Sequence, residues 1–264
     1  MSYFDRALLA IALAGALSGL AGTFIILRRR VLLVQALTHA TFPGAVIAVL
    51  VGLTVQIGAL VASGAILVVL VAIGRLRPAI LQAATGVLLT AGFAVGLLLQ
   101  AMNPEVPLRL EAYLFGSVLA STTTDIAVLA IVLSAVTVTL LVFGRRLGFY
   151  LFDAVGYQAS GMSPWIAEFV LLSLTVATVV ATMPALGALL TISLVAAPAA
   201  AARELTKTLR GMLVIAPMLA VGAGLTGLIL SRSMGLAAGA SIALVACGVY
   251  IVAAAIGRTL GRTR

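Results

Sequence analysis

Long apolar runs separated by short polar clusters occupy the chain from end to end. Each run has about 17 to 25 residues, which is enough for an α-helix to cross the hydrocarbon core of a bilayer. The pattern predicts spanning helices over residues 7–27, 36–52, 56–74, 84–102, 121–143, 165–182, 185–202, 212–230 and 236–257. The sequence therefore predicts an all-α polytopic membrane protein with eight to nine transmembrane helices. The number depends on 183–202, where Met183, Pro184 and Pro198 interrupt the apolar pattern.

The basic residues indicate how these helices are oriented, because Lys and Arg collect in cytoplasmic loops. With nine spans and the N-terminus outside, only Arg6, Arg109 and Arg232 face outward. The basic residues that then face the cytoplasm are Arg28, Arg29, Arg30, Arg75, Arg77, Arg145, Arg146, Arg203, Lys207, Arg210, Arg258, Arg262 and Arg264. We therefore expect an external N-terminus and a cytoplasmic C-terminus. The first run precedes its arginine cluster, the reverse of the order in a signal peptide, so 7–27 is expected to be a retained span.

Composition narrows the function classes. Apolar residues make up 63% of the chain and charged residues 9%, against roughly 25% charged in a soluble domain. The net charge of +9 follows from the loop orientation and from contact with anionic headgroups of the lipid bilayer, and it requires no nucleic acid. The chain has no GxxxxGK[ST] phosphate loop, so we do not expect it to bind ATP through that motif. Its one cysteine, Cys247, excludes an internal disulfide.

The only histidine of the chain, His39, lies within one of the apolar runs, four residues after Gln35. On a helix these two side chains share one face. Pro43 follows four residues later and cannot donate a hydrogen bond to the carbonyl of His39. We predict helix breaks here and at Pro198. Polar groups at this depth must pair or line a polar cavity. His39 therefore either lines such a cavity or is a packed residue whose imidazole is satisfied by a neighbouring helix.

Two loops and a set of glycine pairs complete the pattern. The external segment 103–120 carries Glu105, Arg109 and Glu111, and Arg232 lies on another outer loop; these charges indicate either a docking platform or a solvated connection. The loop 144–164 is cytoplasmic by charge and could press on a soluble partner. Pairs four residues apart, Gly15/Gly19, Gly92/Gly96 and Gly235/Gly239, favour close packing of helices within the chain.

Four stretches resemble the permease subunits of bacterial ABC importers for zinc, manganese and iron(II). They are RRRVLLVQALTHATFPG (28–44), AYLFGSVLA (112–120), FDAVGYQASG (152–161) and GALLTISLVAAPAAAAR (187–203). The resemblance spans nearly the whole chain and implies one transmembrane permease domain, 1–264, of the vitamin B12 importer architecture in the bacterial cytoplasmic membrane. It implies a non-enzymatic subunit that binds no permanent cofactor and carries a divalent metal ion as cargo.

The same resemblance implies partners and site residues. The partners are two cytoplasmic ABC ATPase subunits, an extracytoplasmic metal-binding protein and a second permease copy, as a homodimer or a heterodimer. The stretch around Asp153 and Gly161 is similar to the segment that docks on the ATPase, although Tyr157 replaces the family's alanine. His39 matches the family's metal contact, whereas Gln35 replaces its aspartate. A neutral amide binds a divalent cation less strongly, and imidazole favours zinc over manganese.

A different class of function stays open on the residues alone, namely an ion-coupled secondary transporter or channel for a small cation. Proton-coupled transporters normally keep a carboxylate deep in the membrane. The predicted spans place every acid of this chain in a loop or near a helix end: Asp5, Glu105, Glu111, Asp125, Asp153, Glu168 and Glu204. This distribution favours a permease driven by ATP that a separate subunit hydrolyses, and His39 is the one group that could relay protons.

Overall fold

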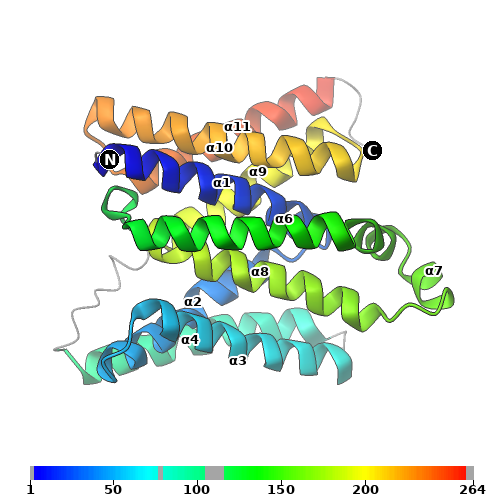
Figure 1. The fold of residues 1–264 in the computed structure, drawn as a ribbon, viewed down its shortest axis with the longest axis horizontal. Helices are drawn as coiled ribbons and strands as arrows, with labels where there is room; N and C mark the ends of the chain where they lie inside the picture. Colours follow the sequence, from blue (N-terminus) through cyan, green and yellow to red (C-terminus); the bar gives the residue numbers. More distant parts are fainter. Residues whose placement is uncertain (1–2, 77–79, 105–115, 260–264) are drawn as a thin grey trace.

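The computed structural model describes residues 3–76, 80–104 and 116–259 (Figure 1). The helices are α1 (Tyr3–Leu27), α2 (Val31–Leu50), α3 (Val55–Leu76), α4 (Leu81–Met102), the short 3₁₀ turn η2 (Val118–Ala120), α6 (Thr123–Phe152), α7 (Ala154–Ala159), α8 (Pro164–Leu186), α9 (Ala188–Leu205), α10 (Leu209–Met234) and α11 (Ala238–Thr259). In the described part of the chain, nine helices are long and apolar enough to cross a membrane. This confirms the predicted all-α polytopic fold.

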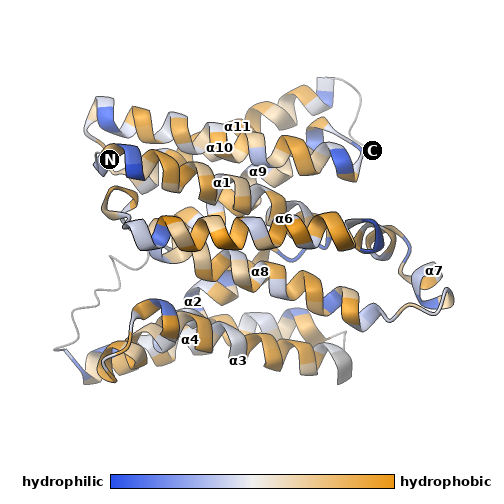
Figure 2. Ribbon diagram, in the orientation of Figure 1, coloured by the Kyte–Doolittle hydropathy of each residue, from blue (hydrophilic) through white to orange (hydrophobic). Residues whose placement is uncertain are grey.

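The long helices lie side by side along the longest dimension of the molecule (Figure 1). α1 packs against α10, α9, α6 and α8, and α2 packs against α4 and α3. The buried face of α1 consists of small and aliphatic residues, among them Ala7, Ala10, Ile11 and Ala14, which are fully inaccessible. Apolar colours run along the helices, and hydrophilic colours gather mainly near their ends (Figure 2). This distribution is the one expected of helices surrounded by lipid.

Two of the three glycine pairs provide close helix contacts within the chain. A Cβ atom at Gly19 would collide with the backbone of Pro217 in α10, and one at Gly92 would lie 2.7 Å from Cβ of Ala40 in α2. Gly235 has a different role, since it ends α10 with a φ of 66°. Small residues let the backbones approach, which is how helices associate in lipid without a hydrophobic driving force.

The helix breaks expected at two prolines do not interrupt their helices. α2 continues through Pro43, and α9 continues through Pro198. Each proline removes one backbone hydrogen bond, and the surrounding helical bonds and packing keep the helix intact. The interruption in this region lies instead between α8 and α9 at Gly187, which has a φ of 80°. The predicted spans 165–182 and 185–202 are thus two complete helices.

The loop predicted over 144–164 is much shorter in the structure. Residues 144–152 continue α6, and the short helix α7 lies in the connection that follows. Leu147 and Tyr150 are buried in this extension, so tertiary packing holds the helix beyond the point where Arg145 and Arg146 indicated a loop. α7 projects at the same end of the molecule as the last turn of α11 (Figure 1). We call this end, which carries Arg28 to Arg30, Arg145, Arg146, Arg203, Lys207 and Arg258, the basic end.

Candidate functional site

His39 and Gln35 lie on α2, and both side chains are partly buried. The His39 ring meets the ring of Phe93 on α4 edge to face, with centroids 5.2 Å apart. Its Nδ1 atom is buried and has no hydrogen-bond partner among the described residues. A buried nitrogen without a partner is costly, so the local packing does not explain why this position carries an imidazole and not an apolar ring.

The polar surroundings of His39 on α2 consist mainly of hydroxyl groups that bond within the helix. Thr38 Oγ1 donates to the Gln35 carbonyl at 2.9 Å, and Thr41 Oγ1 donates to the Thr38 carbonyl at 2.8 Å. Thr41 also approaches Sδ of Met183 on α8, at 3.1 Å. Within the described ranges, no three His, Cys, Asp or Glu side chains are grouped so that they could hold a metal ion. Gln35 and His39 remain the candidate ligands on α2.

A second candidate site is the short helix α7 at the basic end. The Asp153 side chain caps this helix by accepting a hydrogen bond from the Gly156 amide at 2.7 Å. Gly156 fits here because a Cβ atom would collide with the Asp153 carboxylate. Gly161 ends the segment with a φ of 78° and open space around it. The predicted residues Asp153 and Gly161 therefore bracket one compact, exposed turn of helix.

Tyr157 explains how α7 is attached. It is 4% exposed, and its ring lies 5.4 Å from that of Tyr150 and 5.7 Å from that of Phe149 on α6. On the opposite side of α7, Val155 is 80% exposed. The tyrosine that departs from the resembled pattern thus anchors α7 on α6 and leaves an apolar side chain free to contact a partner.

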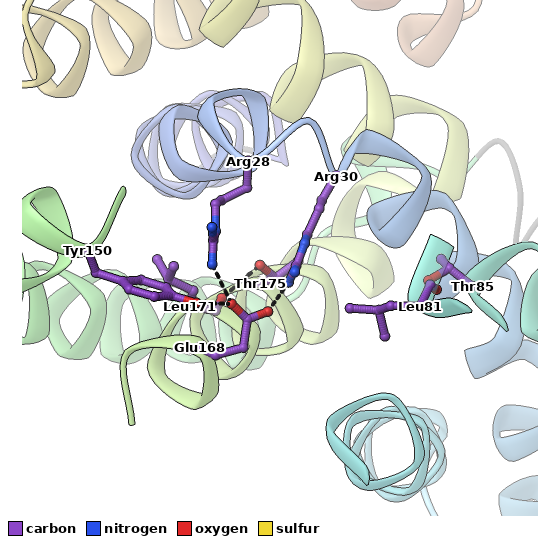
Figure 3. Close-up of polar contacts among 8 residues, drawn as sticks. All are labelled: Arg28, Arg30, Leu81, Thr85, Tyr150, Glu168, Leu171 and Thr175. Carbon is purple, nitrogen blue, oxygen red and sulfur yellow. Dashed lines mark hydrogen bonds and ion pairs between the residues drawn. The ribbon is translucent and has the colours of Figure 1, made fainter. Parts of the chain in front are cut away.

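The basic end also holds an ion-pair cluster that the sequence did not predict (Figure 3). Arg28 Nη2 donates to Glu168 Oε2 at 2.7 Å, and Arg30 forms a second ion pair with Glu168 Oε1. The Tyr150 hydroxyl donates to Glu168 Oε2 at 3.2 Å, and the Arg28 guanidinium lies 4.4 Å from the centre of the Tyr150 ring. The Glu168 side chain is only 16% exposed.

This cluster joins the turn between α1 and α2 to α6 and α8, with Arg28 and Glu168 140 residues apart in the sequence. Arg28 and Arg30 flank the turn between α1 and α2, Tyr150 lies near the end of α6, and Glu168 lies in the second turn of α8. α7 is connected to α6 at its start and to α8 at its end. The cluster contains Tyr150 of α6 and Glu168 of α8, so it fixes the helices on both sides of α7. No local signal in the sequence indicated that Glu168 has two arginine partners.

The end of the molecule opposite the basic end is described only in part. Glu105, Arg109 and Glu111 lie outside the described residues. Arg232, near the end of α10, stacks over the ring of Phe4 on α1, with 4.3 Å from its guanidinium carbon to the ring centre. Thr122 and Asp125 form a reciprocal capping box at the start of α6. The structure therefore places Arg232 in a contact between α1 and α10.

Comparisons with known proteins agree on one family. Residues 1–257 match the model of the ABC 3 transport family. The chain is 34% identical to a manganese transport system membrane protein of Halalkalibacterium halodurans, with 96% of this chain and 86% of that protein covered. It is 33% identical to a zinc transport system membrane protein of Treponema pallidum, with 92% and 85% covered.

A solved structure gives the same result at the level of the fold. PsaBC from Streptococcus pneumoniae, solved in complex with Fab, matches with a TM-score of 0.84 and 27% identity, covering 96% of this chain and 91% of that one. The family match extends over nearly the whole chain, and the fold agrees with that of PsaBC over 96% of this chain. The chain therefore belongs to the ABC 3 transport family, and its fold is that of an ABC transporter permease.

Proposed function

We propose that this protein is the membrane-spanning permease of an ATP-driven importer that moves a divalent metal ion, zinc, manganese or iron, across the bacterial cytoplasmic membrane. The manganese and zinc transport relatives support the cargo class. The geometric observation that carries the proposal is α7, a capped and anchored turn of helix that projects beyond the spanning helices. This chain has no phosphate loop of its own, so a separate subunit would hydrolyse the ATP. That subunit needs a contact point such as α7.

The basic end is the cytoplasmic end in this proposal, because Lys and Arg concentrate there. The N-terminus is then external and the C-terminus cytoplasmic. One ATPase subunit docks at α7 of each permease copy, where Val155 offers apolar surface and Asp153 offers a charge. An external metal-binding protein docks at the opposite end, near Arg232 and the segment that contains Arg109.

His39 is the proposed metal contact on the pathway, and Gln35 lies one helical turn before it. One imidazole and one neutral amide provide no charged ligand from this chain, which suits a conduit that must release its ion. A second permease copy, identical or related, would complete the pathway and could provide the carboxylate that Gln35 lacks. The buried, unpartnered Nδ1 of His39 supports a role beyond packing.

The cluster around Glu168 provides the mechanical link in this proposal. Arg30 immediately precedes α2, and His39 lies about 14 Å further along the helix axis at 1.5 Å per residue. Displacement of α7 by the ATPase would act on Glu168 through α8 and on Tyr150 through α6. Both groups contact the arginines that lead into α2, so movement at α7 would reach the helix that carries His39.

Reconstitution tests the proposed energy source. The purified permease in liposomes is expected to hydrolyse no ATP and to move no metal under a pH gradient. Adding the cognate ATPase and metal-binding protein is expected to produce ATP-dependent accumulation of zinc, manganese or iron. Metal flux driven by a pH gradient through the permease alone would show instead an ion-coupled secondary transporter.

Charge reversal at Asp153 tests the docking role of α7. Asp153→Arg removes the helix cap, which contributes about 1 kcal/mol, and it reverses a charge at the proposed contact. We expect weaker binding of the ATPase, measured by co-purification, with an unchanged melting temperature of the long helices. Asp153→Asn retains a cap and serves as the matched control, with nearly normal binding. Normal assembly and uptake in the Asp153→Arg variant would exclude α7 from the ATPase interface.

A further inference from the structure

A second basic site opens at the basic end, apart from the Glu168 cluster. It is a cavity of about 970 Å³ between the turn that follows α1, the end of α6, the end of α9, the start of α10 and the last turns of α11. Four cationic residues line it, Arg29, Arg203, Lys207 and Arg258, and Glu204 is the one carboxylate in its wall. The cavity thus concentrates positive charge between membrane-spanning helices.

These four cations are not neutralised within the part of the chain that the structure describes. All four side chains are exposed, and the ion pairs found among the described residues use Arg28 and Arg30 instead. Arg29, which lies between those two arginines, has a φ of 55°. That backbone conformation is uncommon for a residue with a side chain, and such an outlier is retained only where the surrounding structure imposes it.

Apart from Glu204 and Thr206, most of the remaining wall of the cavity is apolar. It includes Leu27 and Val31 at the α1–α2 turn, Phe152 at the end of α6, Met212 on α10 and Tyr250 on α11. Phe152 and Tyr250 are 66% and 39% exposed. A ligand that fills this site therefore has an anionic group for the cations and a hydrocarbon part for the apolar wall, which is the chemistry of an anionic phospholipid.

We propose that this cavity binds an anionic phospholipid, with its phosphate among Arg203, Lys207 and Arg258 and its acyl chains along the apolar wall. Basic pockets between transmembrane helices at the cytoplasmic face bind anionic headgroups in this way. The lipid would connect α9, α10 and α11 to the α1–α2 turn at the end that we propose to be cytoplasmic. The inference requires that the chain spans a membrane, and it does not depend on which ion the protein moves.

Lipid titration tests the proposal without any transport measurement. Native mass spectrometry of the full-length permease is expected to show retained phosphatidylglycerol and no retained phosphatidylcholine. Each cation near an anionic headgroup contributes roughly fivefold to affinity. We therefore expect Arg203→Gln, Lys207→Gln and Arg258→Gln each to weaken phosphatidylglycerol binding about fivefold, and the triple variant to weaken it on the order of 100-fold. The matched control is Arg145→Gln with Arg146→Gln, which removes exposed charges at the same end and outside the cavity.

Three results would overturn the proposal. An equal loss of phosphatidylglycerol in the control variant would show a diffuse attraction to the whole basic end. Displacement of phosphatidylglycerol by millimolar inorganic phosphate would show a site for a free anion. Full retention of phosphatidylglycerol by the triple variant would show that the cavity cations do not hold the lipid.

Discussion

Replacement of Glu168 by glutamine is expected to destabilise the permease and to uncouple metal transport from ATP hydrolysis. The substitution leaves Arg28 and Arg30 facing each other without a counter-ion. Removing one partner of a fully buried ion pair costs about 3–5 kcal/mol. Because these side chains are 16–29% exposed and water screens part of the charge, we expect about 2 kcal/mol. Thermal unfolding followed by the fluorescence of Trp165, the single tryptophan, measures the loss.

A double-mutant cycle distinguishes the cluster from a general loss of charge. Glu168→Gln with Arg30→Gln is expected to be less destabilising than the sum of the two single changes, because the second substitution removes an unpaired charge. Glu204→Gln, at the same end and without an ion pair among the described residues, serves as the control. In the assembled transporter, Glu168→Gln is expected to retain ATP hydrolysis while less metal moves per ATP. An additive cycle together with a normal transport ratio would reject the proposed link.

Replacement of His39 by alanine is expected to lower metal uptake at least roughly tenfold while the protein still folds. Loss of groups that only support a metal ligand costs 10–100-fold in affinity or activity, so loss of a ligand should have at least that effect. The substitution leaves Pro43 and the α2 helix unchanged. Uptake of radioactive or fluorescently detected metal into proteoliposomes measures the effect, with the melting temperature as the measure of folding.

A second variant separates the pathway role of His39 from a packing role. His39→Leu keeps the volume that contacts Phe93 and removes the metal-binding nitrogens. If the imidazole is a ligand, alanine and leucine variants are equally inactive; if it only packs, leucine restores uptake.

Gln35→Asp is expected to tighten metal binding, since a carboxylate attracts a divalent ion more strongly than an amide, and to slow release of the ion.

The sequence by itself determined the class of fold and predicted eight to nine long helices, and the described part of the chain contains nine. Apolar runs of about 20 residues have few alternatives to a helix in lipid, because each backbone polar group must be satisfied within its own segment. The predicted spans 7–27 and 84–102 accordingly coincide with α1 and α4 to within a few residues. Gln35 and His39 were also identified from their spacing in an apolar run, whereas Asp153 and Gly161 came from the resemblance to the permease family. Their roles remain proposals.

The tertiary structure decided what surrounds those residues. α6 extends to Phe152 because Leu147 and Tyr150 are buried. The sequence predicted a loop there because of the charges of Arg145 and Arg146. Glu168 pairs with Arg28 and Arg30 across 140 and 138 residues, and Arg203 shares a cavity with Arg29 and Arg258. Hydropathy is a property of each segment alone, whereas these groupings depend on which helices pack together. In lipid, the choice of packing partner follows from close contacts at small residues. Gly19 lies against Pro217 of α10 and Gly92 lies against Ala40 of α2, and only the packed helices show these partners.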